Sequence, residues 1–107
     1  MKTGSLTLIY ITNPSEAEAK KIAVHLLNNK LIACANLFPI NSLYWWKGKI
    51  KDEKEIVLLA KTTEENFEKI KKEVESIHSY SIPCVLKIPA EANERYSGWV
   101  KGETRQT

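Results

Sequence analysis

The stretch Leu31–Thr63 reads "LIACANLFPINSLYWWKGKIKDEKEIVLLAKTT" and decides the fold, because it predicts two long strands joined by one tight turn. Residues 31–46 are extended in character, and Ile50–Thr62 runs back beside them. Gly48 supplies the positive φ that a tight hairpin requires. Pro39 has no amide hydrogen to donate, so it marks an edge strand or a bulge. Arms of about 15 residues would span about 50 Å at 3.3 Å per residue, which is longer than one small domain covers.

A strand and a helix are predicted before this hairpin. Leu6–Thr12 alternates between two faces and is rich in β-branched residues, which favours a strand. Asn13 predicts a helix N-cap, with Pro14 at the first helical position and Glu16 reaching back to the cap amide. The apolar face of this helix ends near Asn29.

A helix, a strand and a last short helix are predicted after the hairpin. Thr63 predicts the cap of the second helix, and residues 84–88 predict a short apolar strand. Asn93 predicts the cap of the last helix. The apolar stripe of the second helix consists of Phe67, Ile70, Val74 and Ile77, and one side of the last helix carries Tyr96, Trp99 and Val100.

The order β α β β α β, with a small extra helix, predicts an α+β protein of the ferredoxin-like kind: a two-layer sandwich with a long hairpin between its second and third strands and a short C-terminal helix. We expect a single domain over residues 1–107, with a core at about 6–100 and a polar, frayed tail at 101–107. Two helices cover one face of such a sheet and leave the other bare.

The apolar residues of the hairpin run continuously instead of alternating. The segments "LIACANLF" and "EIVLLAK" show this pattern, which is typical of strands covered on both faces. About eight such side chains left in water would forfeit on the order of 10 kcal/mol, at about 1.5 kcal/mol each. That is comparable with the whole stability of a small domain. We therefore expect the chain to oligomerise through its open sheet face.

Composition excludes several classes of protein. The 16 basic and 13 acidic residues give a net charge of +3 and are spread along the chain, so no nucleic-acid partner is indicated. No apolar run approaches the roughly 20 residues of a membrane span, and the amino terminus lacks a secretory pattern. Two cysteines are too few for a disulfide scaffold, so we expect reduced thiols in the cytoplasm. Because the common catalytic motifs are missing, we expect no enzyme.

Several separated motifs carry a family resemblance. The segments "LIACANLFPINSLYWWKGKI", "EIVLLAKT", "HSY" followed by "IP", and "YSGW" occur in one order over about residues 6–100, and they are similar to those of the CutA divalent-cation-tolerance family. The resemblance implies a ferredoxin-like protomer assembled as a PII-like homotrimer, with long hairpins that wrap neighbouring subunits. It also implies a part in tolerance of copper and other divalent metals, without an established catalytic activity.

Two positions depart from the family pattern. Ser79 stands where the motif after His78 has a proline, and Cys84 stands where a glutamate follows Pro83. A role of that glutamate as a ligand or proton partner is therefore in doubt here. The matched positions are Cys34, Asn36, Tyr44, Trp46, Gly48, Glu55, Lys61, Thr62, His78, Tyr80, Pro83, Tyr96 and Trp99.

Three residues are candidate metal ligands: Cys34, His78 and Cys84. A thiolate binds soft ions such as Cu(I) far better than a carboxylate does, and a thiol at position 84 would make an oxygen-rich site softer. Each residue also has a structural alternative. Cys34 can be a small buried side chain, His78 can stabilise a helix end, and Cys84 can be a neutral strand residue.

Polar and aromatic candidates remain near the predicted subunit contacts. Glu55, Lys61 and Tyr80 are predicted to line a cleft between subunits, either to bind a small anion or as an intersubunit salt-bridge network. Adjacent strand residues point to opposite faces, so the hairpin aromatics are predicted as interface anchors instead of a stacking platform. The predicted trimer interface comprises Tyr44, Trp45, Trp46, Tyr96 and Trp99.

The leading hypothesis is a cytoplasmic homotrimer that binds copper or another divalent cation through cysteine and histidine, with no organic cofactor and no nucleic-acid or membrane partner. The alternative is a PII-like small-ligand sensor or trimeric scaffold, for which metal binding is incidental. An RNA-binding domain of the same topology would need an open sheet, and a stable monomer that binds single-stranded RNA would support that class instead.

Overall fold

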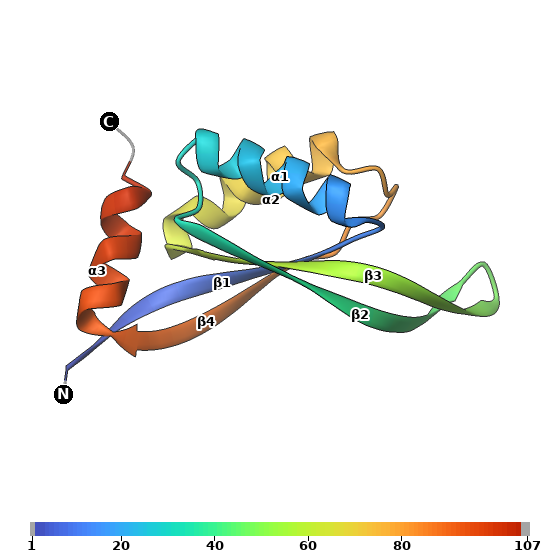
Figure 1. Cartoon of the computed structure of the whole chain (residues 1–107), viewed down its shortest axis with the longest axis horizontal. Helices are drawn as coiled ribbons and strands as arrows, with labels where there is room; N and C mark the ends of the chain where they lie inside the picture. Colours follow the sequence, from blue (N-terminus) through green and yellow to red (C-terminus); the bar gives the residue numbers. More distant parts are fainter. Residues whose placement is uncertain (1, 106–107) are drawn as a thin grey trace.

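The computed structural model describes residues 2–105, which form a four-stranded antiparallel sheet with two helices on one face and a third helix at one end (Figure 1). The sheet order is β2-β3-β1-β4. The predicted α+β, ferredoxin-like βαββαβ arrangement is therefore confirmed. The elements are β1 (Thr3–Asn13), α1 (Glu16–Asn28), β2 (Cys34–Trp46), β3 (Lys49–Thr62), the 3₁₀ turn η1 (Glu64–Asn66), α2 (Phe67–Ile77), β4 (Val85–Asn93) and α3 (Glu94–Glu103).

Both edge strands of the sheet contain a proline. Pro39 lies in β2 and Pro89 in β4, where a missing backbone donor costs least. Pro39 pairs with Ile56 within an unbroken register from Cys34 to Trp46. The sequence predicted either an edge strand or a bulge at Pro39, and the structure shows an edge strand.

The β2–β3 hairpin extends well beyond the helices (Figure 1). Its arms have 13 and 14 residues, and the molecule measures 47 Å along its longest axis. Lys47 and Gly48 form the two-residue turn, with φ of 50° and 79°. Positive φ at both positions matches the right-handed twist of the strands, so the predicted turn at Gly48 is confirmed.

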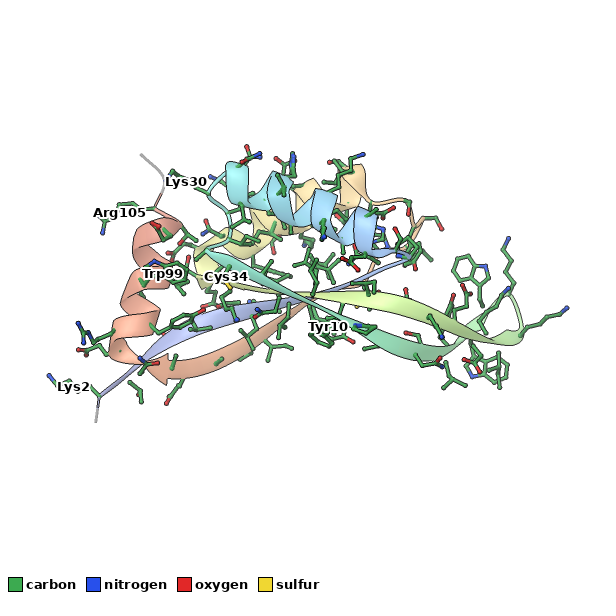
Figure 2. All side chains as sticks on the ribbon, viewed as in Figure 1. Lys2, Tyr10, Lys30, Cys34, Trp99 and Arg105 are labelled. Atoms are coloured by element: carbon green, nitrogen blue, oxygen red, sulfur yellow. The ribbon has the colours of Figure 1, made fainter. Side chains whose placement is uncertain are left out.

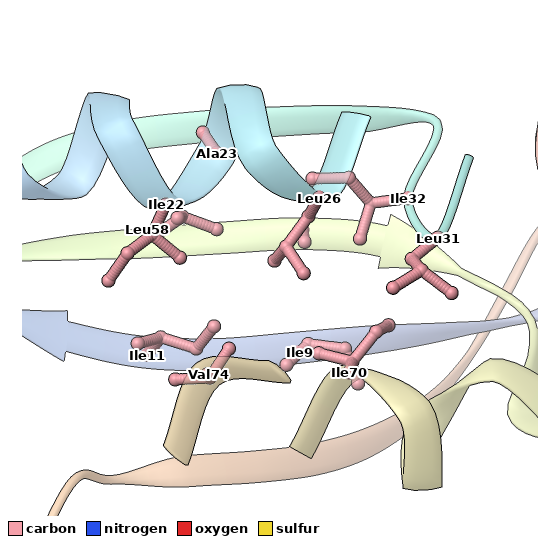
Figure 3. Close-up of a cluster of buried hydrophobic side chains, with 11 residues drawn as sticks. Ile9, Ile11, Ile22, Ala23, Leu26, Leu31, Ile32, Leu58, Ile70 and Val74 are labelled. Atoms are coloured by element: carbon pink, nitrogen blue, oxygen red, sulfur yellow. The ribbon is translucent and has the colours of Figure 1, made fainter. Parts of the chain in front are cut away.

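The hydrophobic core lies between the sheet and the helices α1 and α2 (Figure 3). Strand positions such as Ile9 and Leu58 alternate toward this face and meet Ile22 of α1 and Ile70 of α2. Burying an aliphatic side chain contributes about 1.5–3 kcal/mol. Of the predicted stripe of α2, Ile70 and Val74 are fully buried, while Phe67 and Ile77 pack at its margin.

The opposite face of the sheet is not covered by α1 or α2. The register places Tyr10, Phe38, Val57 and Leu86 there. Leu86 is 51% exposed and Phe38 38% exposed. This open face is an apolar surface within one chain, as the sequence predicted.

Helix α3 packs across the end of the sheet, against β1 and β4 (Figure 1). Ser97 approaches the backbone of Gly4 so closely that a β-carbon on Gly4 would lie 3.0 Å from the β-carbon of Ser97. A glycine at position 4 is therefore what allows α3 to dock. Among residues 2–105, no helix is both long and apolar enough to span a membrane.

The predicted cap of α1 was wrong. Ser15 is the N-cap, and its hydroxyl accepts a hydrogen bond from the Glu18 amide at 3.2 Å. Asn13 instead ends β1 and is fully buried, and its amide donates to the carbonyls of Ile11 and Ile56, each at 3.2 Å. Pairing with β3 extends β1 through position 13, so the cap moves two residues along the chain.

Pairing between β1 and β4 also lengthens both strands beyond their predicted bounds. The two are in register from Thr3 opposite Asn93 to Ile11 opposite Val85. Asn93 does precede the last helix, although its side chain makes no capping bond. That helix enters the stretch expected to be a frayed tail, because Thr104 is buried and bonds the Val100 carbonyl at 2.9 Å. Residues 106–107 lie outside the described residues.

Candidate functional site

A groove of about 520 Å³ lies where the loop after α2 meets the open face of the hairpin. Its walls combine aromatic, acidic and thiol side chains from β2, β3 and the loop. This mixture is typical of a ligand pocket, which is mainly apolar with a few polar groups. The lining residues are Thr12, Tyr44, Trp45, Trp46, Lys51, Glu53, Glu55, Tyr80, Ser81, Ile82 and Cys84.

Glu55 and Tyr80 form the inner contact of this groove. The Tyr80 hydroxyl donates to Glu55 Oε2 at 2.6 Å, and Glu55 is 9% exposed. Partial burial, and then the bond to the Glu55 carboxylate, raise the pKa of Tyr80 far above its ordinary value. The phenol therefore stays protonated and holds the carboxylate in place.

A second phenol–carboxylate pair lies further along the arm. The Tyr44 hydroxyl donates to Glu53 Oε1 at 2.7 Å, and this bond is the main reason that the pKa of Tyr44 is raised. Glu53 and Glu55 point to the same face of β3, since they are two residues apart on a strand. Sequence reasoning missed Glu53, although its alternation with Glu55 was the signal that could have found it.

Cys84 lies at the rim of the same groove. Its thiol is half-buried and forms no disulfide. Burial, and then the nearby Glu55 carboxylate, raise the pKa of Cys84. The thiol and two carboxylates therefore line one groove.

His78 is a buried anchor for the loop that carries Tyr80. As the residue that ends α2, it has a fully buried side chain, with Nε2 at 2.8 Å from the Thr12 carbonyl oxygen. Nδ1 accepts a hydrogen bond from the Tyr80 amide at 3.0 Å. Since a carbonyl only accepts and an amide N–H only donates, these two bonds fix the tautomer with hydrogen on Nε2. Both ring nitrogens are thus already engaged.

Ser79, the departure from the family motif, ties this loop to α1. Its amide and its hydroxyl both donate to Glu18 Oε2, at 3.2 and 2.9 Å. A proline at this position could make neither bond. The same Glu18 oxygen lies 3.4 Å from His78 Nδ1. Ser79 therefore has a structural role in positioning the loop.

Cys34 belongs to a second cluster near α3 (Figure 2). The Lys61 ammonium lies 3.8 Å from Cys34 Sγ and also donates to Asn36 Oδ1. Burial, and then the proximity of Cys34, raise the pKa of Tyr96. The Tyr96 and Trp99 rings are 5.6 Å apart. A cation, an amide, a phenol and a thiol thus meet where β2 begins.

Within one chain, the structure divides the predicted site residues between these two places. Lys61 and Glu55 are six residues apart on β3, which corresponds to about 20 Å at 3.3 Å per residue. In residues 2–105 no three His, Cys, Asp or Glu side chains gather as a cation site. A shared cleft for Glu55, Lys61 and Tyr80 between subunits, and metal ligation by Cys34, His78 and Cys84, stay predictions.

The hairpin aromatics are accessible in the single chain. Trp45 is 71% exposed, and Tyr44 and Trp46 are partly covered along the groove. Ile82 of the loop is 75% exposed and was not singled out from the sequence. These side chains form an apolar border around the two phenol–carboxylate pairs.

Residues 7–103 match the family model described as CutA1 divalent ion tolerance protein. The chain belongs to this family. The divalent-cation tolerance protein CutA of Archaeoglobus fulgidus is 45% identical over 93 residues, which cover 86% of this chain and 91% of that protein. CutA of Pyrococcus horikoshii is 36% identical over 102 residues, covering 94% and 100%.

Solved CutA structures share the whole fold. The Archaeoglobus fulgidus protein, described as periplasmic, superposes with a TM-score of 0.91 at 40% identity, over 94% of this chain and 99% of that one. CutA1 of Oryza sativa gives a TM-score of 0.91 at 34% identity, over 98% of both chains. The resemblance found from the motifs is therefore confirmed.

Proposed function

We propose that this CutA chain acts in divalent-cation tolerance by binding metal ions directly, with copper the leading candidate. The observation that supports the proposal is the lining of the groove, which includes the Cys84 thiol and the Glu53 and Glu55 carboxylates, although these side chains do not gather as a cation site in residues 2–105 of one chain. Such a mixed sulfur and oxygen set suits both soft and borderline cations. The proposal contains no catalytic step, and the relatives are likewise named for tolerance.

Cys34 and His78 are the other two proposed ligands, and neither lines the groove within one chain. Cys34 begins β2 on the open face, where a neighbouring subunit could add a ligand. His78 would first have to release the Thr12 carbonyl or the Tyr80 amide. The two thiols are therefore the more accessible ligands, and His78 couples metal binding to the position of the loop.

Metal titration of the full chain tests this proposal. Cu(I), Cu(II) and Zn(II) are titrated into the wild type and into Cys34→Ser, Cys84→Ser and His78→Gln. We expect at least tenfold weaker binding of one of these ions in a cysteine variant, because serine is a poor ligand for soft metals. Equal affinity for every ion in all three variants would overturn the proposed ligands.

We propose a homotrimer as the working form, assembled through the open sheet face. The exposed apolar side chains of that face support this, as do the aromatic residues of the projecting hairpin. In this assembly Tyr44, Trp45, Trp46, Tyr96 and Trp99 would contact neighbours. We also propose the cytoplasm as its compartment, since both thiols are free in the structure. Cell fractionation tests the compartment.

The groove itself favours a second candidate function, a PII-like sensor of a small ligand. Its volume of about 520 Å³ falls within the roughly 300–1,000 Å³ of small-molecule sites. A single metal ion would fill a small part of it. Under this alternative, the ligand occupies the groove and metal binding at the thiols is incidental.

A further inference from the structure

We propose that a second pocket of this chain binds a small zwitterion of the free α-amino-acid class. The pocket has a volume of about 320 Å³ and lies between β1, β4, the turn η1 and the last helix, α3. This volume is at the lower end of the range for small-molecule sites. The pocket shares no residue with the groove, and neither cysteine nor histidine lines it. The inference therefore goes beyond the function proposed above and does not depend on it.

The pocket lies away from the surfaces proposed to contact neighbouring subunits. Thr7 shares with Ile9 the face of β1 that α1 and α2 cover. Lys87 pairs with Ile9 and so lies on this face as well. On α3, Lys101 is two residues from Trp99, which places the two about 200° apart around the helix. In an assembly through the open sheet face, the pocket therefore faces outward.

The inner wall of the pocket contains a buried hydroxyl group without a partner. Thr7 is 5% exposed, and within residues 2–105 its hydroxyl makes no hydrogen bond. Thr63 is also buried, and its oxygen accepts a bond from Asn66 Nδ2 at 3.3 Å, which leaves its hydrogen available to donate. An unpaired buried hydroxyl destabilises a fold. A ligand that accepts hydrogen bonds from this wall would remove that cost.

Two opposite charges border the same pocket without pairing. Lys87 Nζ lies 3.1 Å from Glu64 Oε1, so these two charges balance each other. Glu65 lines the pocket from η1 and Lys101 lines it from α3, and within residues 2–105 neither forms an ion pair. Both also line the adjoining cavity. One carboxylate and one ammonium group are therefore available to a ligand at this border.

This balance of charges favours a zwitterion over a simple ion. Two acids and two lysines line the pocket, so its formal charge is zero. A simple anion would be attracted by Lys101 and repelled by Glu65, and a simple cation would meet the reverse. A ligand that carries both charges is attracted at both ends. The free α-amino acids are small molecules that carry an ammonium and a carboxylate group on one carbon atom.

The walls suit the remaining parts of such a ligand. The hydroxyls of Thr7 and Thr63 each have a hydrogen to donate, and a carboxylate accepts hydrogen bonds without donating any. We therefore assign the ligand carboxylate to these hydroxyls and to Lys101, and the ligand ammonium group to Glu65. Pro89, opposite Thr7 in the register, adds an apolar wall for a short aliphatic side chain.

NMR titration of the ¹⁵N-labelled full chain in its native assembly tests the inference. The probes are L-alanine, propanoate and ethylammonium, because the last two each lack one of the charged groups of L-alanine. We expect L-alanine to shift the amide signals of Thr7, Glu65 and Lys101 saturably, and each singly charged probe to bind about tenfold more weakly. Higher salt should weaken the binding of L-alanine. Absence of saturable shifts, or equal binding of a singly charged probe, would overturn the inference.

Thr7→Val separates a ligand contact from a role in the fold. Because the Thr7 hydroxyl has no partner within residues 2–105, its removal should leave the thermal midpoint unchanged or raise it. Binding of L-alanine should weaken by about tenfold, since its carboxylate loses a hydrogen bond. A variant that is less stable, or that binds L-alanine as the wild type does, would contradict the inference.

Charge variants test the two ends of the ligand. Lys101→Gln and Glu65→Gln should each weaken the binding of L-alanine, but Glu65→Gln should strengthen the binding of propanoate, because it removes the repelling carboxylate. Lys21→Gln on α1 and Glu75→Gln on α2 are the matched controls, since both positions are exposed and neither lines the pocket. The controls should bind as the wild type does. Equal weakening in controls and pocket variants would indicate a nonspecific charge effect and overturn the inference.

Discussion

Within a single chain, the protonation of Tyr80, which is bonded to Glu55, affects stability at high pH. The pKa of Tyr80 is raised from the ordinary value of 10 by burial and by its bond to Glu55. The folded chain therefore holds this proton more tightly than the unfolded chain. Its stabilising contribution is complete below pH 10 and is lost as the pH rises from 10 toward the higher folded pKa.

Urea unfolding of Tyr80→Phe at pH 7 and at pH 11 tests this prediction. At pH 7 we expect the variant to lose about 1–2 kcal/mol of unfolding free energy, because Glu55 loses a hydrogen bond. Between pH 7 and pH 11 the free energy should fall less in the variant than in the wild type, since the variant has no phenol to ionise at position 80. An equal fall in both proteins would contradict the assignment.

The pKa of the Cys84 thiol also depends on the Glu55 carboxylate. Burial is the larger cause of its raised pKa, and Glu55 is the second. Because the thiolate is the reactive form, alkylation of Cys84 in a Cys34→Ser background should reach half its maximal rate above pH 9. Glu55→Gln should move this profile to lower pH without restoring the ordinary thiol value.

Asp52→Asn is the control for the Cys84 profile, since it removes a charge of the same sign from the other face of β3. Its profile should match that of the parent. A Glu55→Gln profile that does not move would show that burial alone sets the reactivity of Cys84.

For individual residues, local sequence patterns indicated what a side chain can do, but they did not always indicate where the residue lies in the fold. The segment "TNPSEA" led to the prediction of Asn13 as the cap, because Pro14 and Glu16 follow it at the expected positions. Pairing of Asn13 with Ile56, 43 residues away, made it a strand residue, and no local pattern contains that information. Within one chain Glu55 contacts Tyr80 and Lys61 contacts Cys34, so the predicted cleft of Glu55, Lys61 and Tyr80 between subunits depends on the assembly, which a single sequence does not specify.

The geometry of the hairpin turn depends on a single glycine. Gly48 has a φ of 79° and no atom within 4 Å of the position of a β-carbon. Gly48→Ala should therefore cost about 1–2 kcal/mol through backbone strain alone, since a β-carbon disfavours the left-handed region. The measurement is the midpoint of chemical unfolding at neutral pH.

Gly98 in α3 provides the matched control for Gly48. A β-carbon there also meets open space, but its φ is not positive. Gly98→Ala should therefore stabilise the protein by about 0.5–1 kcal/mol, as expected for alanine in a helix. The prediction fails if both substitutions change stability in the same direction.

The elements with strong local sequence patterns were predicted correctly, but the residues at which they begin and end were not. The turn at Gly48 and the stripe of α2 follow from two-residue and helical spacing. The length of β4 follows from nine paired positions with β1, and the docking of α3 depends on the space above Gly4. Both are contacts between distant segments, which a single sequence does not specify.

At the scale of the whole molecule, the open sheet face is the feature that indicates association with another subunit. Its exposed apolar side chains come from both edge strands, such as Phe38 on β2 and Leu86 on β4, so no rearrangement of one element could bury them. The same face carries Cys34 at one end and borders the groove at the other. Assembly through this face would therefore bring both candidate sites close to a neighbouring subunit.

Leu86→Glu tests that assembly, because it places a charge on the open face, on the edge strand β4. We expect the wild type to sediment as a trimer and the variant to shift toward monomer, since burying an unpaired carboxylate costs far more than the contact gains. Val24→Glu is the control: Val24 is 53% exposed on α1, against 51% for Leu86, and α1 covers the opposite face. The control should remain a trimer, and circular dichroism should show that both variants keep their secondary structure. If Leu86→Glu also remains a trimer, the subunits do not meet through the open face, and the projecting hairpin becomes the surface to test next.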